Sequence, residues 1–171
     1  SEPRADNAIY DLADAIRRIQ AYEFPAMSND VTLRSLATYA GSAEPKLAKA
    51  IAKFVKNPAS RKAAKALAAD HDINPILRTT CVPTMLRGGH AENALPQTAT
   101  ATINCRIFPG VAVDDVKAQL ARVAANPALE FKTLDEPLEG PASELRPDVE
   151  AAISASVKAR SPGAILTPYM E

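Results

Sequence analysis

An arginine inside a predicted strand is the residue that most directly implies binding chemistry. Arg106 lies on the polar face of the alternating stretch 98–107, and its guanidinium offers a planar fork of donors that fits a carboxylate or a phosphate. A surface arginine paired with an acidic neighbour is the competing interpretation. Asn93, which precedes Ala-Leu-Pro, has the residue type of a turn. From the residues alone, both interpretations of Arg106 stay open.

The sequence holds no complete active site. It contains no His-Glu-x-x-His, no Gly-x-Ser-x-Gly and no Gly-x-x-x-x-Gly-Lys. Its 2 histidines, His71 and His90, would need carboxylates from scattered positions to form a metal site. We interpret His71 as a surface residue at a helix end and His90 as a loop residue after two glycines. No catalytic residue and no metal ligand is assigned.

The 2 cysteines, Cys81 and Cys105, are too few for a disulfide scaffold and lack the short spacing of a zinc site. If residues 79–86 and 98–107 form an antiparallel pair, the two cysteines lie at similar distances from its centre near Asn93. We therefore expect them to be close in space. We expect two reduced, buried thiols rather than a disulfide.

Hydrophobic periodicity predicts the elements that position these residues. In chain order they are a helix over 6–20 capped by Asp6, helices within 31–75, strands over 79–86 and 98–107, a helix over 113–123 and a short strand over 129–134. Helix, strand, strand, helix, strand is a ferredoxin-like βαββαβ arrangement that lacks its first strand, which predicts an α+β fold. After a linker near Pro137, a further helix carries Val149, Ile153 and Val157 on one face and leads to a strand candidate at 164–166.

Charge and hydropathy exclude two classes of partner. The 20 basic and 20 acidic residues cancel, and no stretch forms the continuous positive surface that nucleic acid requires. The lysines between residues 46 and 65 are interpreted as a solvated helix face. No run approaches the roughly 18 apolar residues that span a bilayer. We therefore expect no nucleic acid, no membrane and a soluble chain, whose parent is cytoplasmic, periplasmic or secreted.

Residues 78–110 carry a family resemblance. They contain, in order, Arg-Thr-Thr, Gly-Gly, Asn-x-Leu-Pro-Gln and Asn-x-Arg-x-x-Pro-Gly. This pattern closely resembles the lid-domain hairpin of the aminoacylase and glutamate-carboxypeptidase family of two-zinc metallopeptidases, especially its carboxypeptidase S-like and N-acyl-amino-acid hydrolase branch. Residues 1–13 resemble the continuation of a Gly-His-Ser-Ser segment, and residues 166–171 resemble a catalytic-domain strand that runs into Gly-Ala-Thr-Asp.

The resemblance implies a domain division and a cofactor. Residues 1–136 would form the lid, or dimerisation, domain with a helical insertion at about 31–75, and residues 137–171 would begin the C-terminal part of the catalytic domain. Two zinc ions in the parent active site would activate a water, with a catalytic-domain glutamate as general base. Their ligands are expected before Ser1 and after Glu171, so this chain alone is expected to be inactive.

The resemblance also implies site residues and a partner. Asn93 and Arg106 resemble the family's groups that hold the substrate's backbone and its terminal carboxylate. No role carries over to His90, because that position varies within the branch. The family's usual dimer contact implies a homodimer through the edge strand 78–86 and the helix 6–20.

Two functions from different classes remain. The favoured one is a lid and dimerisation part of a zinc-dependent enzyme that cleaves the amide bond of peptides or N-acyl amino acids. The alternative is a stand-alone ferredoxin-like binding or oligomerisation module without catalysis. The sequence leaves open the substrate's side chain, its acyl group, and the choice between peptidase and aminoacylase.

Overall fold

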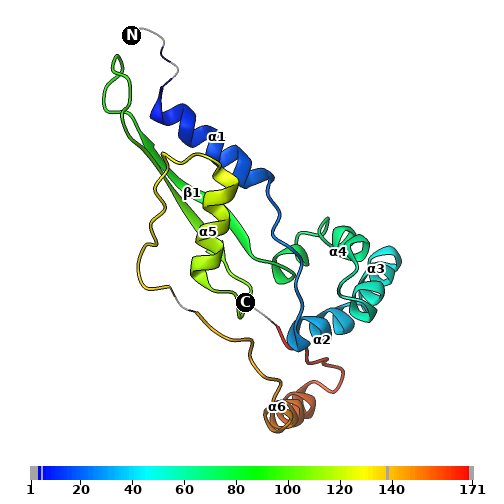
Figure 1. Ribbon diagram of the computed structural model, residues 1–171. Coiled ribbons are helices and arrows are strands. Elements are labelled where there is room, and N and C mark those ends of the chain that lie inside the picture. Colours follow the sequence, from blue (N-terminus) through cyan, green and yellow to red (C-terminus); the bar gives the residue numbers. More distant parts are fainter. Residues whose placement is uncertain (1–3, 5, 138, 170–171) are drawn as a thin grey trace. The chain divides into compact units, whose positions relative to one another are not determined.

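The computed structural model describes residues 4, 6–137 and 139–169, and the chain divides into two compact units (Figure 1). The first unit is formed by the described residues of 1–25 and 79–140, and the second by those of 26–78 and 141–171. None of the helices among these residues is long and apolar enough to cross a membrane.

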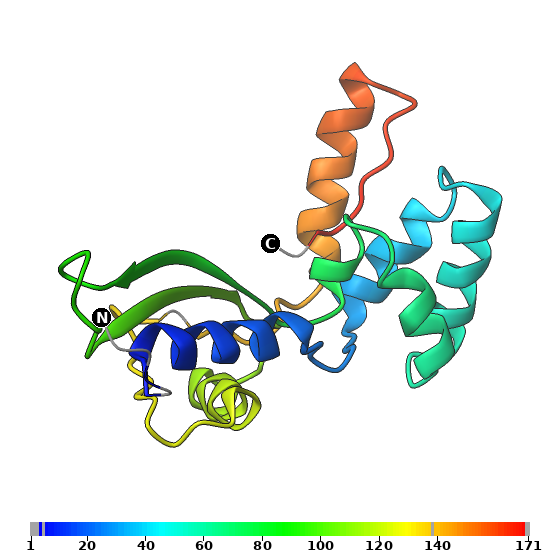
Figure 2. The ribbon, with the colours of Figure 1, turned by 90° about the horizontal axis from the view of Figure 1, so that it is seen from above.

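The first unit is a β-hairpin covered on one face by two helices (Figure 2). Its elements are α1 (Ala8–Ala21), β1 (Thr80–Gly88), β2 (Ala99–Arg106) and α5 (Val113–Ala124). Strands β1 and β2 pair antiparallel as a two-stranded sheet. A two-stranded sheet is marginal alone, so its stability depends on the helices packed against it. The predicted α+β fold is confirmed, as a mixed helix and sheet arrangement consistent with a ferredoxin-like domain.

The core of this unit is formed by the apolar faces of α1, α5 and the hairpin. Ala15 and Ile19 of α1 meet Val116 and Leu120 of α5, and all four are buried. Partly buried residues of the hairpin complete the cluster, namely Cys81, Ile103, Cys105 and Ile107. The alternation over 98–107 therefore identified the face that packs on the helices.

Hydrogen bonds from side chains pair backbone groups at the start of α1 and at the end of α5. Asn7, and not Asp6 as predicted, caps α1, because its side-chain oxygen accepts the N–H of Ile9 at 2.9 Å. At the other end of the layer, Arg18 donates to the carbonyl of Ala124 at 2.6 Å, where α5 ends. A cation is favourable at a helix C-terminus, so Arg18 ties the two helices together.

The predicted strand over 129–134 is wrong, because these residues form no strand. In the βαββαβ arrangement the last strand pairs with the first, and the described residues contain only the middle pair. Leu129 and Phe131 still pack on the core between the helices and the sheet. The alternation in this segment therefore arises because its apolar side chains are partly buried, although its backbone does not pair with a neighbouring strand.

The second unit is helical. Its elements are α2 (Asp30–Tyr39), α3 (Pro45–Lys56), α4 (Arg61–Leu67), the 3-10 helix η1 (Asn74–Ile76) and α6 (Pro147–Arg160). Leu36, Ile51, Phe54, Leu67 and Leu77 are almost fully buried and form its core. The helices predicted within 31–75 are confirmed, and their assignment as an insertion stays a prediction.

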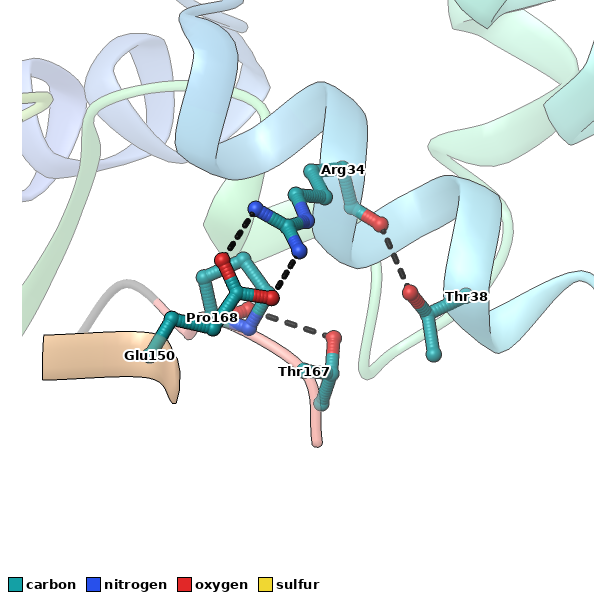
Figure 3. A network of polar contacts seen from close by, with 5 residues as sticks. All are labelled: Arg34, Thr38, Glu150, Thr167 and Pro168. Atoms are coloured by element: carbon teal, nitrogen blue, oxygen red, sulfur yellow. Dashed lines mark hydrogen bonds and ion pairs between the residues drawn. The ribbon is translucent and has the colours of Figure 1, made fainter. Parts of the chain in front are cut away.

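Helix α6 joins the insertion through a polar contact. The guanidinium of Arg34 on α2 binds both carboxylate oxygens of Glu150 on α6, one of them at 2.8 Å (Figure 3). The pair is largely exposed, so its contribution to stability is expected to be below about 1 kcal/mol. Helix α6 buries no residue of its own, and Val149 and Ile153 on its apolar face are exposed.

The strand candidate at 164–166 is also wrong, because these residues form no strand. Ile165 is 79% exposed, and no neighbouring strand lies beside this segment among the described residues. A strand needs a partner for its backbone groups, so the apolar sequence by itself could not produce one here. The predicted domain division between residues 136 and 137 concerns the parent protein and stays a prediction.

Candidate functional site

The hairpin has one face free of helices, which we call the outer face. Its residues are Thr80, Val82, Met85 and Arg87 of β1 and Thr100, Thr102, Asn104 and Arg106 of β2. The opposite face carries Cys81, Ile103 and Cys105, which pack against α1 and α5. Because cross-strand partners share a face, the register assigns each side chain to one side.

The register changes at one point in β1. Pro83 pairs with Ile103, but the next pair is Met85 with Thr102, so Thr84 is the extra residue of a β-bulge. The bulge moves Met85 to the outer face and turns Leu86 towards the helix side. A proline in a strand is tolerated at an edge or a bulge, and Pro83 occupies both.

Cys81 and Cys105 form a disulfide, which corrects the prediction of two reduced thiols. The prediction that they are close is confirmed, because they are direct cross-strand partners. Their Cα atoms are 4.1 Å apart, the close spacing of a non-hydrogen-bonded antiparallel pair. This close pairing brings the two sulfurs within bonding distance.

Arg106 stands at the open end of the hairpin, on the outer face and opposite Thr80. Its side chain is exposed and makes no hydrogen bond or ion pair with the part of the chain that the structure describes. The strand end beside it is fixed, since the N–H of Phe108 donates to the buried Thr79 hydroxyl at 3.0 Å. The structure thus presents an unpaired guanidinium on a positioned strand, and the acidic neighbour of the competing interpretation is not found among the described residues.

Asn93 lies in the connection between the strands, in a turn, and is exposed. This connection leaves β1 at Gly89, whose φ of 77° suits glycine. Gly88 is also constrained, because a Cβ there would lie 3.1 Å from Ile9 of α1. His90 follows these glycines and is exposed, with no role assigned.

The two predicted substrate-binding residues are not brought together within one chain. Asn93 precedes β2 and Arg106 ends it, so the full length of the strand, roughly 23 Å, separates their backbones. This distance is too long for both side chains to bind one carboxylate. Their assignment as substrate-binding residues stays a prediction.

The described residues provide no metal site, since no group of three or more His, Cys, Asp or Glu side chains converges among them. The pKa of Asp148 is lowered by its hydrogen bond to Arg146, but this exposed pair lies at the start of α6 and not on the hairpin.

Sequence reasoning missed two exposed apolar residues of the outer face. Val82 is 59% exposed and Met85 is 51% exposed. The bulge at Thr84 interrupts the alternation of β1. The rule that every second residue lies on the same face therefore fails across it, and the sequence could not assign the later residues to a face.

The comparisons with known proteins identify the class. The family model described as the peptidase dimerisation domain matches residues 1–132, and the chain therefore belongs to the peptidase dimerisation domain family. No solved structure matches the chain.

One curated relative is informative. The chain is 36% identical over 61 residues to the human protein named N-fatty-acyl-amino acid synthase/hydrolase PM20D1. The match covers 36% of this chain and 12% of the human protein. The match thus spans only a small part of the length of this relative.

Proposed function

We propose that these residues are the lid and dimerisation domain of a zinc-dependent hydrolase that cleaves the amide bond of N-acyl amino acids or peptides. The observation that carries the proposal is Arg106, an exposed guanidinium without a partner among the described residues, on the open face of a peptidase dimerisation domain. Substrates of this class end in a carboxylate, for which the planar fork of an arginine is suited.

The task of Arg106 in this proposal is orientation. A bidentate grip on the terminal carboxylate fixes the substrate at one end, so that the scissile amide takes one position relative to the catalytic groups of the parent. The resemblance to the carboxypeptidase S-like and N-acyl-amino-acid hydrolase branch, and the name of the human relative, favour an N-acyl amino acid.

A homodimer offers a way to use Asn93 together with Arg106. If two copies pair antiparallel along the free edges of β1, the Gly88 end of one strand meets the Thr80 end of the other. Arg106 lies opposite Thr80, so the connection that carries Asn93 of the partner subunit approaches it. One substrate could then contact Arg106 of one copy and Asn93 of the other.

The activity is tested with the complete protein that contains these residues. We expect it to hydrolyse N-acetyl-leucine but not N-acetyl-isoamylamine, which is the same molecule without the carboxylate. Chelation should abolish hydrolysis and added zinc should restore it. Equal rates on both amides would contradict a carboxylate-binding role, and no hydrolysis of either would favour the stand-alone binding module.

The dimer is tested by light scattering after size-exclusion chromatography. We expect a molar mass twice that of one chain and a shift towards monomer in Tyr10→Asp, because Tyr10 is an exposed aromatic residue of α1, 62% exposed, at the predicted contact. The matched control is Ala118→Asp, which places the same charge on an exposed position of α5. A monomer at high concentration, or equal effects of both variants, would refute this contact.

A further inference from the structure

The outer face of the hairpin combines two exposed cations, Arg87 and Arg106, with two exposed apolar side chains between them. Val82 and Met85 point away from the α1 and α5 layer, although both are large apolar residues. Leu86 follows directly and is 63% exposed, but it pairs with Ala101 on the helix side. The chain therefore carries two apolar residues on the face of Arg106 and a similarly exposed one on the opposite face.

The spacing along this face is set by the register. Val82 is opposite Asn104, the outer-face residue of β2 that comes two positions before Arg106. Val82 is therefore a diagonal neighbour of Arg106, at about 7–8 Å. Met85 is opposite Thr102, two outer-face positions from Arg106, which corresponds to about 13 Å along the strand. The three side chains thus form a row that starts at Arg106, and Arg87, the next outer-face residue of β1 after Met85, lies beyond its far end.

This row has the dimensions of an N-acyl amino acid with an extended acyl chain. Carbons on either side of a trans amide are about 3.8 Å apart, so the acyl chain begins about 5 Å from the carboxylate carbon. An acetyl group ends before it reaches Val82. A chain of about eight carbons or more would pass Val82 and reach Met85, given carbon–carbon bonds of about 1.5 Å.

We propose that Val82 and Met85 bind the apolar acyl chain of an N-acyl amino acid whose carboxylate is held by Arg106. This inference rests on the proposed function and makes it more specific, because it assigns the preference for long acyl chains to β1. The occupant is fixed by charge complementarity at Arg106 and by the apolar residues that continue the row. Burial of the acyl chain against Val82 and Met85 favours long-chain over acetyl substrates.

The test compares chain lengths in the complete, zinc-loaded protein. The variant Val82→Thr/Met85→Gln keeps the approximate shape of both side chains and makes them polar. The control Leu86→Gln makes the same kind of change at a similarly exposed position on the other face. KM and kcat are measured for N-acetyl-leucine and N-lauroyl-leucine. Hydrolysis of N-acetyl-leucine also reports whether each variant is folded.

We expect the double variant to raise the KM for N-lauroyl-leucine roughly tenfold and to leave that for N-acetyl-leucine unchanged. Leu86→Gln should change neither. An unchanged ratio of the two KM values would overturn the proposal. An equal rise in KM for both substrates would also overturn it. It would mean that Val82 and Met85 contact another part of the protein and not the acyl chain.

A failure of the underlying function would look different. If Arg106→Ala changed neither KM, the carboxylate would not bind at Arg106, and the proposed function would fail together with this inference. If Arg106→Ala impaired both substrates while Val82→Thr/Met85→Gln left their ratio unchanged, only the acyl-chain assignment would fail.

Discussion

Replacement of Arg106 with alanine is expected to raise the KM for an N-acyl amino acid about 100-fold or more in the complete protein. The expected loss is about 3 kcal/mol of charge-assisted, bidentate hydrogen bonding, and each 1.4 kcal/mol corresponds to a tenfold change. The Arg106 side chain makes no hydrogen bond or ion pair with the residues that the structure describes, so the variant removes no side-chain contact known to hold the fold. The effect should therefore appear in substrate binding and not in stability.

Two further variants separate charge, geometry and surface effects. Arg106→Lys keeps the charge but loses the planar fork, and we expect it to recover only part of the loss. Arg122→Ala removes an exposed arginine from α5, on the other side of the sheet, and should be silent. If Arg106→Ala and Arg122→Ala had the same small effect, Arg106 would be an ordinary surface residue.

Reduction of the Cys81–Cys105 disulfide is expected to lower the free energy of unfolding of the first unit by about 3 kcal/mol. The two cysteines are 24 residues apart in the sequence, so the bond closes a loop that contains most of the hairpin. Its main effect is to reduce the conformational freedom of the unfolded chain. It also fixes the register of a two-stranded sheet, which has little stability of its own.

Urea unfolding with and without reductant measures this contribution. The double variant Cys81→Ala/Cys105→Ala is the control, because it should match the reduced protein and be insensitive to reductant. A midpoint that reductant does not move in the unsubstituted protein would contradict the prediction.

The elements that could be predicted are those whose partners lie in the same stretch of chain. The alternation over 98–107 identified the packed face of β2, and the apolar stripe of 113–123 identified α5, because both repeat within a few residues. The cap of α1 was misplaced by one residue, at Asp6 instead of Asn7, since both residue types can accept the same hydrogen bond.

The errors arose where the outcome depends on a distant or absent neighbour. Residues 129–134 have the pattern of a strand, but a strand forms only beside another. The disulfide requires the cross-strand pairing of Cys81 and Cys105, which the sequence predicted. It also requires oxidised cysteines, whereas the small number of cysteines had led us to expect reduced thiols. Val82 and Met85 were missed because the bulge at Thr84 interrupts the alternation of β1.

For the site, the sequence predicted the residue types but not their separation. Asn93 and Arg106 were expected to act on one substrate, and the structure places them at opposite ends of β2. The observed strand pairing establishes this separation, because a segment of 13 residues can fold back on itself or extend. That both side chains bind substrate stays a prediction, and the Arg106 variants test the part that concerns Arg106.

Pro83 constrains how two copies of this domain can align. In the close pairing of Cys81 with Cys105 the backbone groups of Cys81 point away from β2, and those of Pro83, two residues on, point to the same free edge. Proline has no N–H, so a second strand cannot pair evenly across this position. Pairing is instead favoured beyond it, towards Gly88.

A two-fold axis near Leu86 would place Arg106 and the connection that carries the partner's Asn93 on the same side of the axis. An axis near Pro83, two register positions away, would move them apart along the strands by roughly 13 Å. In the proposed dimer, a residue that only removes one hydrogen-bond donor from an edge would thereby select the alignment in which the two proposed substrate-binding residues come together.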